Sequence, residues 1–156
     1  EKSFSSYFAM GSYSFFASFL FSLLSGPTGE ELGWRGYLRE ELDKKYSFFG
    51  AALIQGIIWT FWHTVLWFVD SDFTGFELVP YIVSNLLVMT SLVFVMNTVL
   101  EKHKNLIYSI VIHFTFNFIY CFLQVDIWFY ALFSVVYVLI GAGFYLWRTK
   151  SVQERE

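Results

Sequence analysis

The sequence is poor in charged residues, in cysteine and in proline. Charged residues make up 15% of its 156 positions and hydrophobic residues 56%, whereas soluble proteins carry about 25% charged residues. The single cysteine excludes a disulfide framework and a cysteine-based metal site. No basic stripe points to nucleic acid as a partner, and neither proline falls inside an apolar run. The composition therefore indicates an integral membrane protein in a lipid bilayer.

The N-terminal end lacks the features of a secretion signal. The first residue is Glu1, and no basic segment precedes the first apolar run. We therefore expect an excerpt of a longer chain, in which residues 1–156 form one membrane-embedded domain and further spans lie upstream.

Long apolar runs occupy most of the chain. Five of them approach the roughly 20 residues with which a helix crosses a bilayer, namely 7–25, 51–69, 81–100, 106–123 and 127–147. Because lipid does not tolerate open sheet edges, these runs predict an all-α, polytopic bundle of about five transmembrane helices.

Lysine and arginine residues alternate between the connecting segments. The successive connections carry four, none, two, none and, in the C-terminal tail, three of them: Arg35, Arg39, Lys44 and Lys45, then Lys102 and Lys104, then Arg148, Lys150 and Arg155. Cytoplasmic loops are enriched in these residues. The pattern therefore places segments 26–50 and 101–105 and the C-terminus in the cytoplasm.

Polar residues recur inside three of the apolar runs. The run 51–69 contains His63, and the run 106–123 carries a stripe about four residues apart, which continues to Gln124 just after it: Ser109, His113, Asn117, Cys121 and Gln124. Such a stripe is costly against lipid and must face protein or a wet cavity. We therefore expect a polar cleft that faces the cytoplasm. Ser84, Ser91 and Thr98 in the third run are interpreted as packing residues without a chemical role.

The stretch from Thr28 to Leu38 places two adjacent carboxylates and an arginine just beyond the first apolar run. Thr28 and Glu31 have the spacing of a capping box, which predicts the start of a helix. Glu31 and Arg35 are four residues apart and can pair on one face of that helix. Glu30 lies about 100° further round the helix, without an obvious local partner, and is a candidate working group.

Two chemistries fit these residues. In the first, Glu30 or Glu31 serves as general base for a water molecule, His63 shares that water, and His113 and Asn117 donate hydrogen bonds to a carbonyl oxygen. In the second, His63, His113 and a glutamate bind zinc. Each residue also has a purely structural interpretation. An intramembrane histidine can link helices, and the Glu30–Glu31 doublet can complement a helix dipole. Trp34, Trp128 and Trp147 are interpreted as an interfacial belt.

Three short motifs together resemble one family. The Glu30-Glu31-x-x-x-Arg35 stretch resembles the Glu-Glu-x-x-x-Arg motif of the CAAX protease and bacteriocin-processing family, also called the Abi family of intramembrane proteases. Trp59 to His63 resembles its Phe-x-x-x-His motif, with Trp59 in place of Phe as an aromatic packing residue. His113 to Asn117 resembles its His-x-x-x-Asn or His-x-x-x-Asp motif. The motifs occur in the family's order within residues 26–124.

The resemblance implies a role for each of these residues. Glu30 would activate water with the help of His63, His113 and Asn117 would bind the oxyanion, and Glu31 with Arg35 would support the site. The family has been described both as metalloproteases and as glutamate proteases. We favour the metal-free glutamate mechanism and keep zinc as the alternative. The implied substrate is a membrane-associated peptide or protein, in some members lipidated.

We therefore expect an intramembrane endopeptidase in a bacterial cell membrane. A non-catalytic bacteriocin-immunity or partner-binding protein on the same scaffold is the alternative. A small transporter or proton relay would also explain buried Glu and His residues, but it would more naturally show two related halves, and no such repeat is visible.

Overall fold

The computed structural model describes residues 15–24, 26–69, 73–120, 122 and 126–154, and every regular element in this part of the chain is helical. The elements are α1 (Phe15–Leu24), α2 (Pro27–Glu31), the π-helix η2 (Leu32–Leu38), α3 (Arg39–Asp43), α4 (Phe48–Trp62), α5 (Thr64–Val69), the 3₁₀ turn η3 (Gly75–Glu77), α6 (Leu78–His103), α7 (Ile107–Tyr120) and α8 (Ile127–Gln153). The all-α prediction is confirmed.

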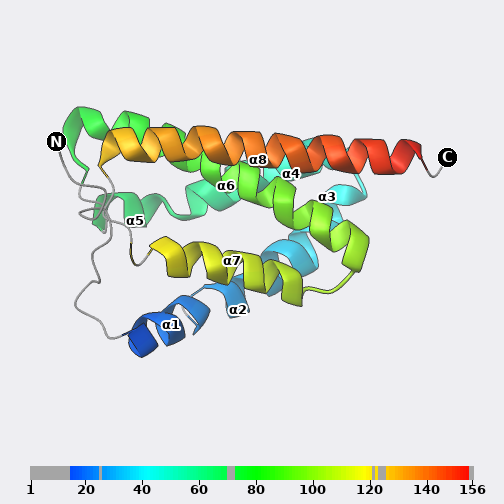
Figure 1. Cartoon of the computed structure of the whole chain (residues 1–156), viewed down its shortest axis with the longest axis horizontal. Coiled ribbons are helices and arrows are strands. Elements are labelled where there is room, and N and C mark those ends of the chain that lie inside the picture. The colour runs from blue at the N-terminus through cyan, green and yellow to red at the C-terminus, as the bar shows by residue number, and fades with distance from the viewer. Residues whose placement is uncertain (1–14, 25, 70–72, 121, 123–125, 155–156) are drawn as a thin grey trace.

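Helices α6 and α8 are the longest elements and lie side by side (Figure 1). The segments Gly75–His103 and Ile127–Gln153, of 29 and 27 residues, are long and apolar enough to cross a membrane. The apolar helices α4 and α7 are shorter than a full span. Residues 7–14 and 25 of the expected run 7–25 lie outside the described residues, which begin at Phe15. The number of five spans therefore stays a prediction.

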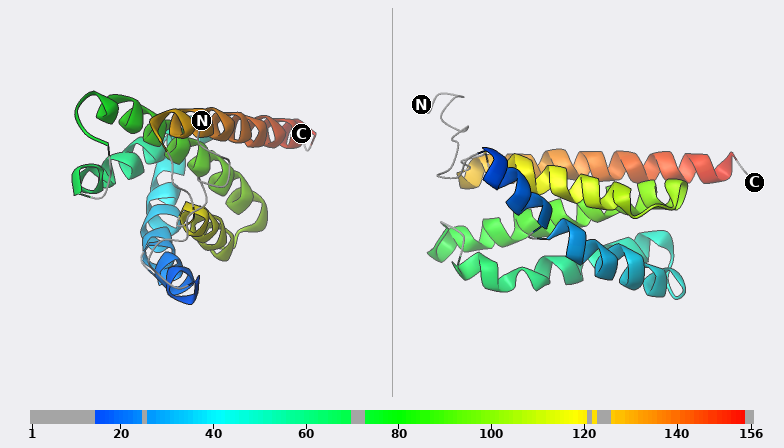
Figure 2. Two further views of the ribbon diagram at one scale, coloured as in Figure 1. Left: turned by 60° about the vertical axis from the view of Figure 1, so that its left-hand side comes forward. Right: turned by 90° about the horizontal axis from the view of Figure 1, so that it is seen from below.

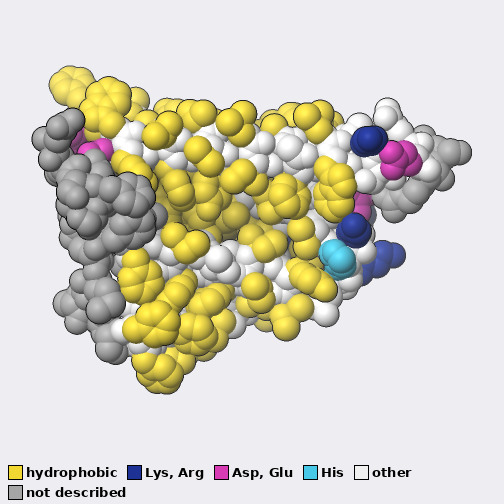
Figure 3. Space-filling view, viewed as in Figure 1, with side chains coloured by type: hydrophobic (Ala, Val, Ile, Leu, Met, Phe, Trp, Pro, Cys, Tyr) yellow, Lys and Arg dark blue, Asp and Glu magenta, His cyan; other side chains and the backbone are white. Residues whose placement is uncertain are grey.

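The turn after α3, the turn between α6 and α7 and the C-terminus lie at the same end of the bundle (Figures 1 and 2). On the face shown in Figure 3, lysine and arginine side chains gather at this end, and hydrophobic side chains cover the surface between the two ends. The basic connections identified in the sequence therefore share one end of the bundle, as a single membrane orientation requires.

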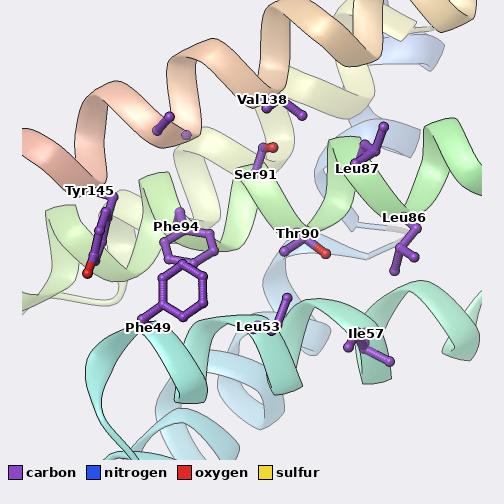
Figure 4. A pocket seen from close by; sticks show the side chains of 12 residues that line it. Phe49, Leu53, Ile57, Leu86, Leu87, Thr90, Ser91, Phe94, Val138 and Tyr145 are labelled. Atoms are coloured by element: carbon purple, nitrogen blue, oxygen red, sulfur yellow. The ribbon is translucent and has the colours of Figure 1, made fainter.

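Small residues let α6 approach its two neighbours closely. A Cβ at Gly56 of α4 would lie 2.7 Å from the Cα of Thr90, and a Cβ at Gly141 of α8 would lie 3.0 Å from the Cα of Ser91. Such contacts are typical of helix pairs in membranes. Ser84, Ser91 and Thr98 are all buried, in agreement with their interpretation as packing residues. Beside these contacts, α4, α6 and α8 border an apolar groove of about 440 Å³ (Figure 4).

The interpretation of 51–69 as one continuous helix is wrong, because the helix is interrupted at His63 between α4 and α5. The Nδ1 of His63 lies 2.8 Å from the carbonyl oxygen of Trp59, while the backbone N–H of His63 bonds the carbonyl of Thr60 instead. The imidazole thus occupies the carbonyl that the helix would otherwise use for its next i to i−4 bond.

The capping box at Thr28 is also wrong. Helix α2 begins two residues earlier, with Gly26 as its N-cap and Pro27 at its first position, where a proline loses no hydrogen bond. Thr28 already lies inside the helix, and its hydroxyl donates to the carbonyl of Leu23 at 3.3 Å. The expected helix nevertheless forms and runs on through η2 and α3 to Asp43.

Candidate active site

Glu31 holds together two elements that are far apart in the sequence. Its Oε1 accepts hydrogen bonds from Arg35 at 2.7 Å and from the Nδ1 of His113 in α7 at 2.8 Å. The three residues are 0%, 2% and 3% exposed. The predicted pairing of Glu31 with Arg35 is therefore confirmed as a contact. Because buried charges need such partners, this cluster fixes α2 and η2 against α7.

Glu30 has a different set of partners. Its Oε2 accepts one hydrogen bond from the indole N–H of Trp34 at 3.1 Å and another from that of Trp59 at 3.0 Å. The sequence had left Glu30 without a local partner, although Trp34 is four residues further along the chain. The interpretation of Trp34 as part of an interfacial belt did not include this contact with the carboxylate. Trp59 likewise does more than pack.

Four of the predicted site residues line one cavity of about 580 Å³: Glu30 of α2, His63 at the break after α4, and His113 and Asn117 of α7. The catalytic hypothesis requires this convergence. Glu31 and Arg35 lie behind the cavity and do not line it. Sequence reasoning missed the opposite wall, to which α6, α7 and α8 contribute polar aromatic and amide side chains: Tyr81, Asn85, Tyr120 and Tyr130.

Glu30 also borders a second hollow, of about 600 Å³, on the other side of α2. This outer groove is lined largely by small and aromatic residues: Leu24, Gly26, Gly29, Gly33, Trp34, Tyr37, Leu38 and Trp62. The Glu30 carboxylate therefore lies where an outer groove meets an inner cavity.

Comparison with known proteins identifies the family. A family model described as Type II CAAX prenyl endopeptidase Rce1-like matches residues 12–119. The chain belongs to this Rce1-like family. The CAAX prenyl protease 2 of Methanococcus maripaludis is 34% identical over 120 residues, which cover 69% of this chain and 42% of that protein. These findings confirm the resemblance inferred from the three motifs. This Rce1-like chain spans less than half the length of that relative.

The hydrogen-bond partners of the two cavity histidines assign their protons in this Rce1-like chain. The Nδ1 of His63 faces a carbonyl oxygen and that of His113 faces a carboxylate. Both partners can only accept, so each Nδ1 carries a hydrogen. In a neutral ring the remaining nitrogen, Nε2, is then an acceptor, and it becomes a donor only when the ring is protonated.

The residues after Glu31 form a π-helix, which the sequence did not predict. The backbone N–H of Arg39 bonds the carbonyl of Trp34, five residues earlier. The side-chain amide of Gln55 donates to the same carbonyl, and its oxygen accepts a hydrogen bond from Asn97 at 2.9 Å. π-Helices occur often at functional sites. Here the irregular turn lets Gln55 bind the backbone carbonyl of Trp34, and Asn97 in turn binds Gln55.

The metal alternative requires several His, Cys, Asp or Glu side chains close enough together to share one ion. Among the residues that the structure describes, no group of three or more His, Cys, Asp or Glu side chains is arranged to hold a metal ion. The choice between a metal-free and a zinc-dependent reaction stays a prediction, and so do the individual roles of the six site residues.

Proposed function

We propose that this chain forms the catalytic part of an intramembrane endopeptidase that hydrolyses a peptide bond in a lipidated, membrane-associated substrate. The observation that carries the proposal is the convergence of Glu30, His63, His113 and Asn117 on one cavity. The family of the chain supports the reaction type, and the name of its archaeal relative supports a CAAX-type substrate.

In the proposed reaction, Glu30 removes a proton from a water molecule in the cavity, and the oxygen of that water forms a bond with the carbonyl carbon of the peptide. The electron pair of the carbonyl double bond moves to its oxygen, which His113 and Asn117 bind. Collapse of this intermediate breaks the carbon–nitrogen bond. Glu30 then returns its proton to the departing amine nitrogen, so that an acid and an amine are released.

The two histidines have different proposed roles, which follow from their different hydrogen-bond partners. His63 faces a neutral carbonyl and keeps an acceptor nitrogen, which can share the attacking water with Glu30. His113 binds the Glu31 carboxylate through Nδ1. This leaves its Nε2 to donate a hydrogen to the oxyanion when the ring carries both protons. Arg35 keeps Glu31 in place.

The arrangement of charge supports a reaction near the cytoplasmic surface. The basic connections share one end of the bundle (Figures 1 and 2), and the outer groove gives Glu30 a second approach besides the inner cavity. We propose that the substrate polypeptide reaches Glu30 from this cytoplasmic end while its lipid stays in the bilayer.

The test is cleavage of a prenylated CAAX-type peptide by the purified protein and by Glu30→Gln. The glutamine keeps the size and the hydrogen-bond acceptor of the side chain but cannot remove a proton. We expect the rate to fall at least about 1,000-fold. The unfolding midpoint should not change. Undiminished cleavage by Glu30→Gln would refute the proposal.

Two further arms refine the result. A bacteriocin-precursor peptide and the unprenylated CAAX-type peptide show which substrate class is accepted. A strong zinc chelator should leave the rate unchanged. Loss of activity with the chelator and recovery with zinc would replace the metal-free mechanism by the metal-dependent one, with His63 and His113 as ligands.

A further inference from the structure

The two oxygens of Glu30 have different surroundings. Oε2 accepts hydrogen bonds from two indole N–H groups, those of Trp34 and Trp59. Oε1 instead lies beside Gly26, where a Cβ would be 3.0 Å from Oε1 and 3.6 Å from the Nδ2 of Asn117. The space next to Oε1 therefore opens toward the amide of Asn117.

Both indoles are fixed by contacts of their own. Trp59 is completely buried, the guanidinium of Arg35 lies 4.1 Å from the centre of its ring, and the His113 ring packs edge-on against it at 5.0 Å. The Trp34 ring packs edge-on against the ring of Trp62, with 5.9 Å between the ring centres. Neither indole can turn away from Glu30 without breaking these contacts.

We propose that Trp34 and Trp59 are positioning residues that clamp Oε2 of Glu30 and thereby make Oε1 the oxygen that accepts the proton from water. The proposal deepens the function given above and rests on it. One oxygen with two fixed donors cannot rotate toward the substrate, so the carboxylate presents the same oxygen in every turnover. Such preorganisation removes a reorientation step from the reaction.

The two donors of the clamp are uncharged N–H groups, so removing one of them changes a hydrogen bond of Glu30 without changing the charge of the site. The other titratable groups around Glu30 are Glu31, Arg35, His63, His113 and, on the outer groove and the far cavity wall, Tyr37, Tyr81, Tyr120 and Tyr130. Tryptophan variants leave all of these in place. A change in the pH profile of such a variant therefore reports the lost N–H donor.

The test uses Trp34→Phe, and Trp59 replaced by β-(3-benzothienyl)alanine, an isostere of tryptophan that lacks the N–H. This isostere keeps the ring that packs on Arg35 and His113. In each variant we expect the acidic limb of the kcat profile to move, because the carboxylate has lost one of its two hydrogen-bond donors. At the optimum kcat should fall about threefold to tenfold with little change in KM. Trp128→Phe, at an exposed position on α8, is the matched control and should match the wild type.

A second readout needs no substrate. In protein labelled with ¹⁵N-tryptophan, which has six tryptophans, Glu30→Gln should move the indole signals of Trp34 and Trp59 and leave that of Trp128 in place. Wild-type acidic limbs in both tryptophan variants, or indole signals that ignore Glu30→Gln, would overturn the clamp and leave the proposed function standing. An active Glu30→Gln would overturn both.

Discussion

Glu30 and Glu31 are neighbours in the chain but lie in two contrasting regions of the molecule. Glu31 is sealed in the bundle, where Arg35 and His113 share one of its oxygens. Glu30 lies at the junction of a cavity and a groove and is held by two uncharged donors. One step along a helix turns a side chain by about 100°. That rotation alone separates a carboxylate that stabilises the fold from one that can meet a substrate.

The contrast predicts opposite outcomes for the same substitution. Glu31→Gln removes the charge that balances the buried Arg35, so we expect the free energy of unfolding to fall by about 3 kcal/mol, together with a loss of activity. Glu30→Gln should leave the free energy of unfolding within about 0.5 kcal/mol of the wild-type value. Unfolding in a titration with SDS measures both.

The matched pair makes the comparison easy to contradict. Equal stability losses in Glu31→Gln and Glu30→Gln would show that the two carboxylates do not differ in structural role. Glu31→Gln with normal stability would show that Arg35 does not depend on its partner.

How far the sequence predicted the site depends on how local each contact is. The pairing of Glu31 with Arg35 follows from their spacing in one helix. The convergence of His113 and Asn117 follows from the four-residue stripe, since a polar stripe has to face a cavity. The contacts of Glu30 were missed for two reasons: Trp34 was interpreted by its hydrophobic character, and Trp59 lies 29 residues away.

The details of the helices were predicted less well than their existence. Apolar length predicted α6 and α8, but the break at His63 depends on one side chain taking a backbone carbonyl. The π-helix is accompanied by a hydrogen bond from the side chain of Gln55 to the carbonyl of Trp34. The pattern of apolar residues in the sequence does not predict either hydrogen bond.

Of the two residues proposed to bind the oxyanion in the cavity beside Glu30, Asn117 can be replaced with less effect on the fold than His113. Asn117 is only partly buried, whereas His113 is bonded to Glu31, so its removal also disturbs the fold. We expect Asn117→Ala to lower kcat about 100-fold, as loss of one oxyanion donor does elsewhere, with unchanged KM and unfolding midpoint. Asn117→Leu, which nearly keeps the size but loses the donor, should be equally slow. A normal kcat in both variants would remove Asn117 from the oxyanion role.

A smaller effect concerns Gly26, which leaves room beside Oε1 of Glu30. In Gly26→Ala the new methyl group would lie 3.0 Å from that oxygen, in the space that the attacking water needs. We therefore expect kcat to fall about tenfold, or about 1.4 kcal/mol in the barrier. Gly29→Ala, where a Cβ meets no atom within 4 Å, is the control for kcat.

The Gly26→Ala effect should depend on the clamp at the other oxygen. With Trp34 and Trp59 in place, the carboxylate cannot retreat from the methyl group, because movement away from Gly26 would break the bonds of Oε2. With Trp34→Phe the carboxylate has one restraint fewer and can yield by the few tenths of an ångström required. We therefore expect the double variant to be faster than the product of the two single effects, by about threefold in a double-mutant cycle of kcat. Strict additivity would mean that the two oxygens of Glu30 are positioned independently.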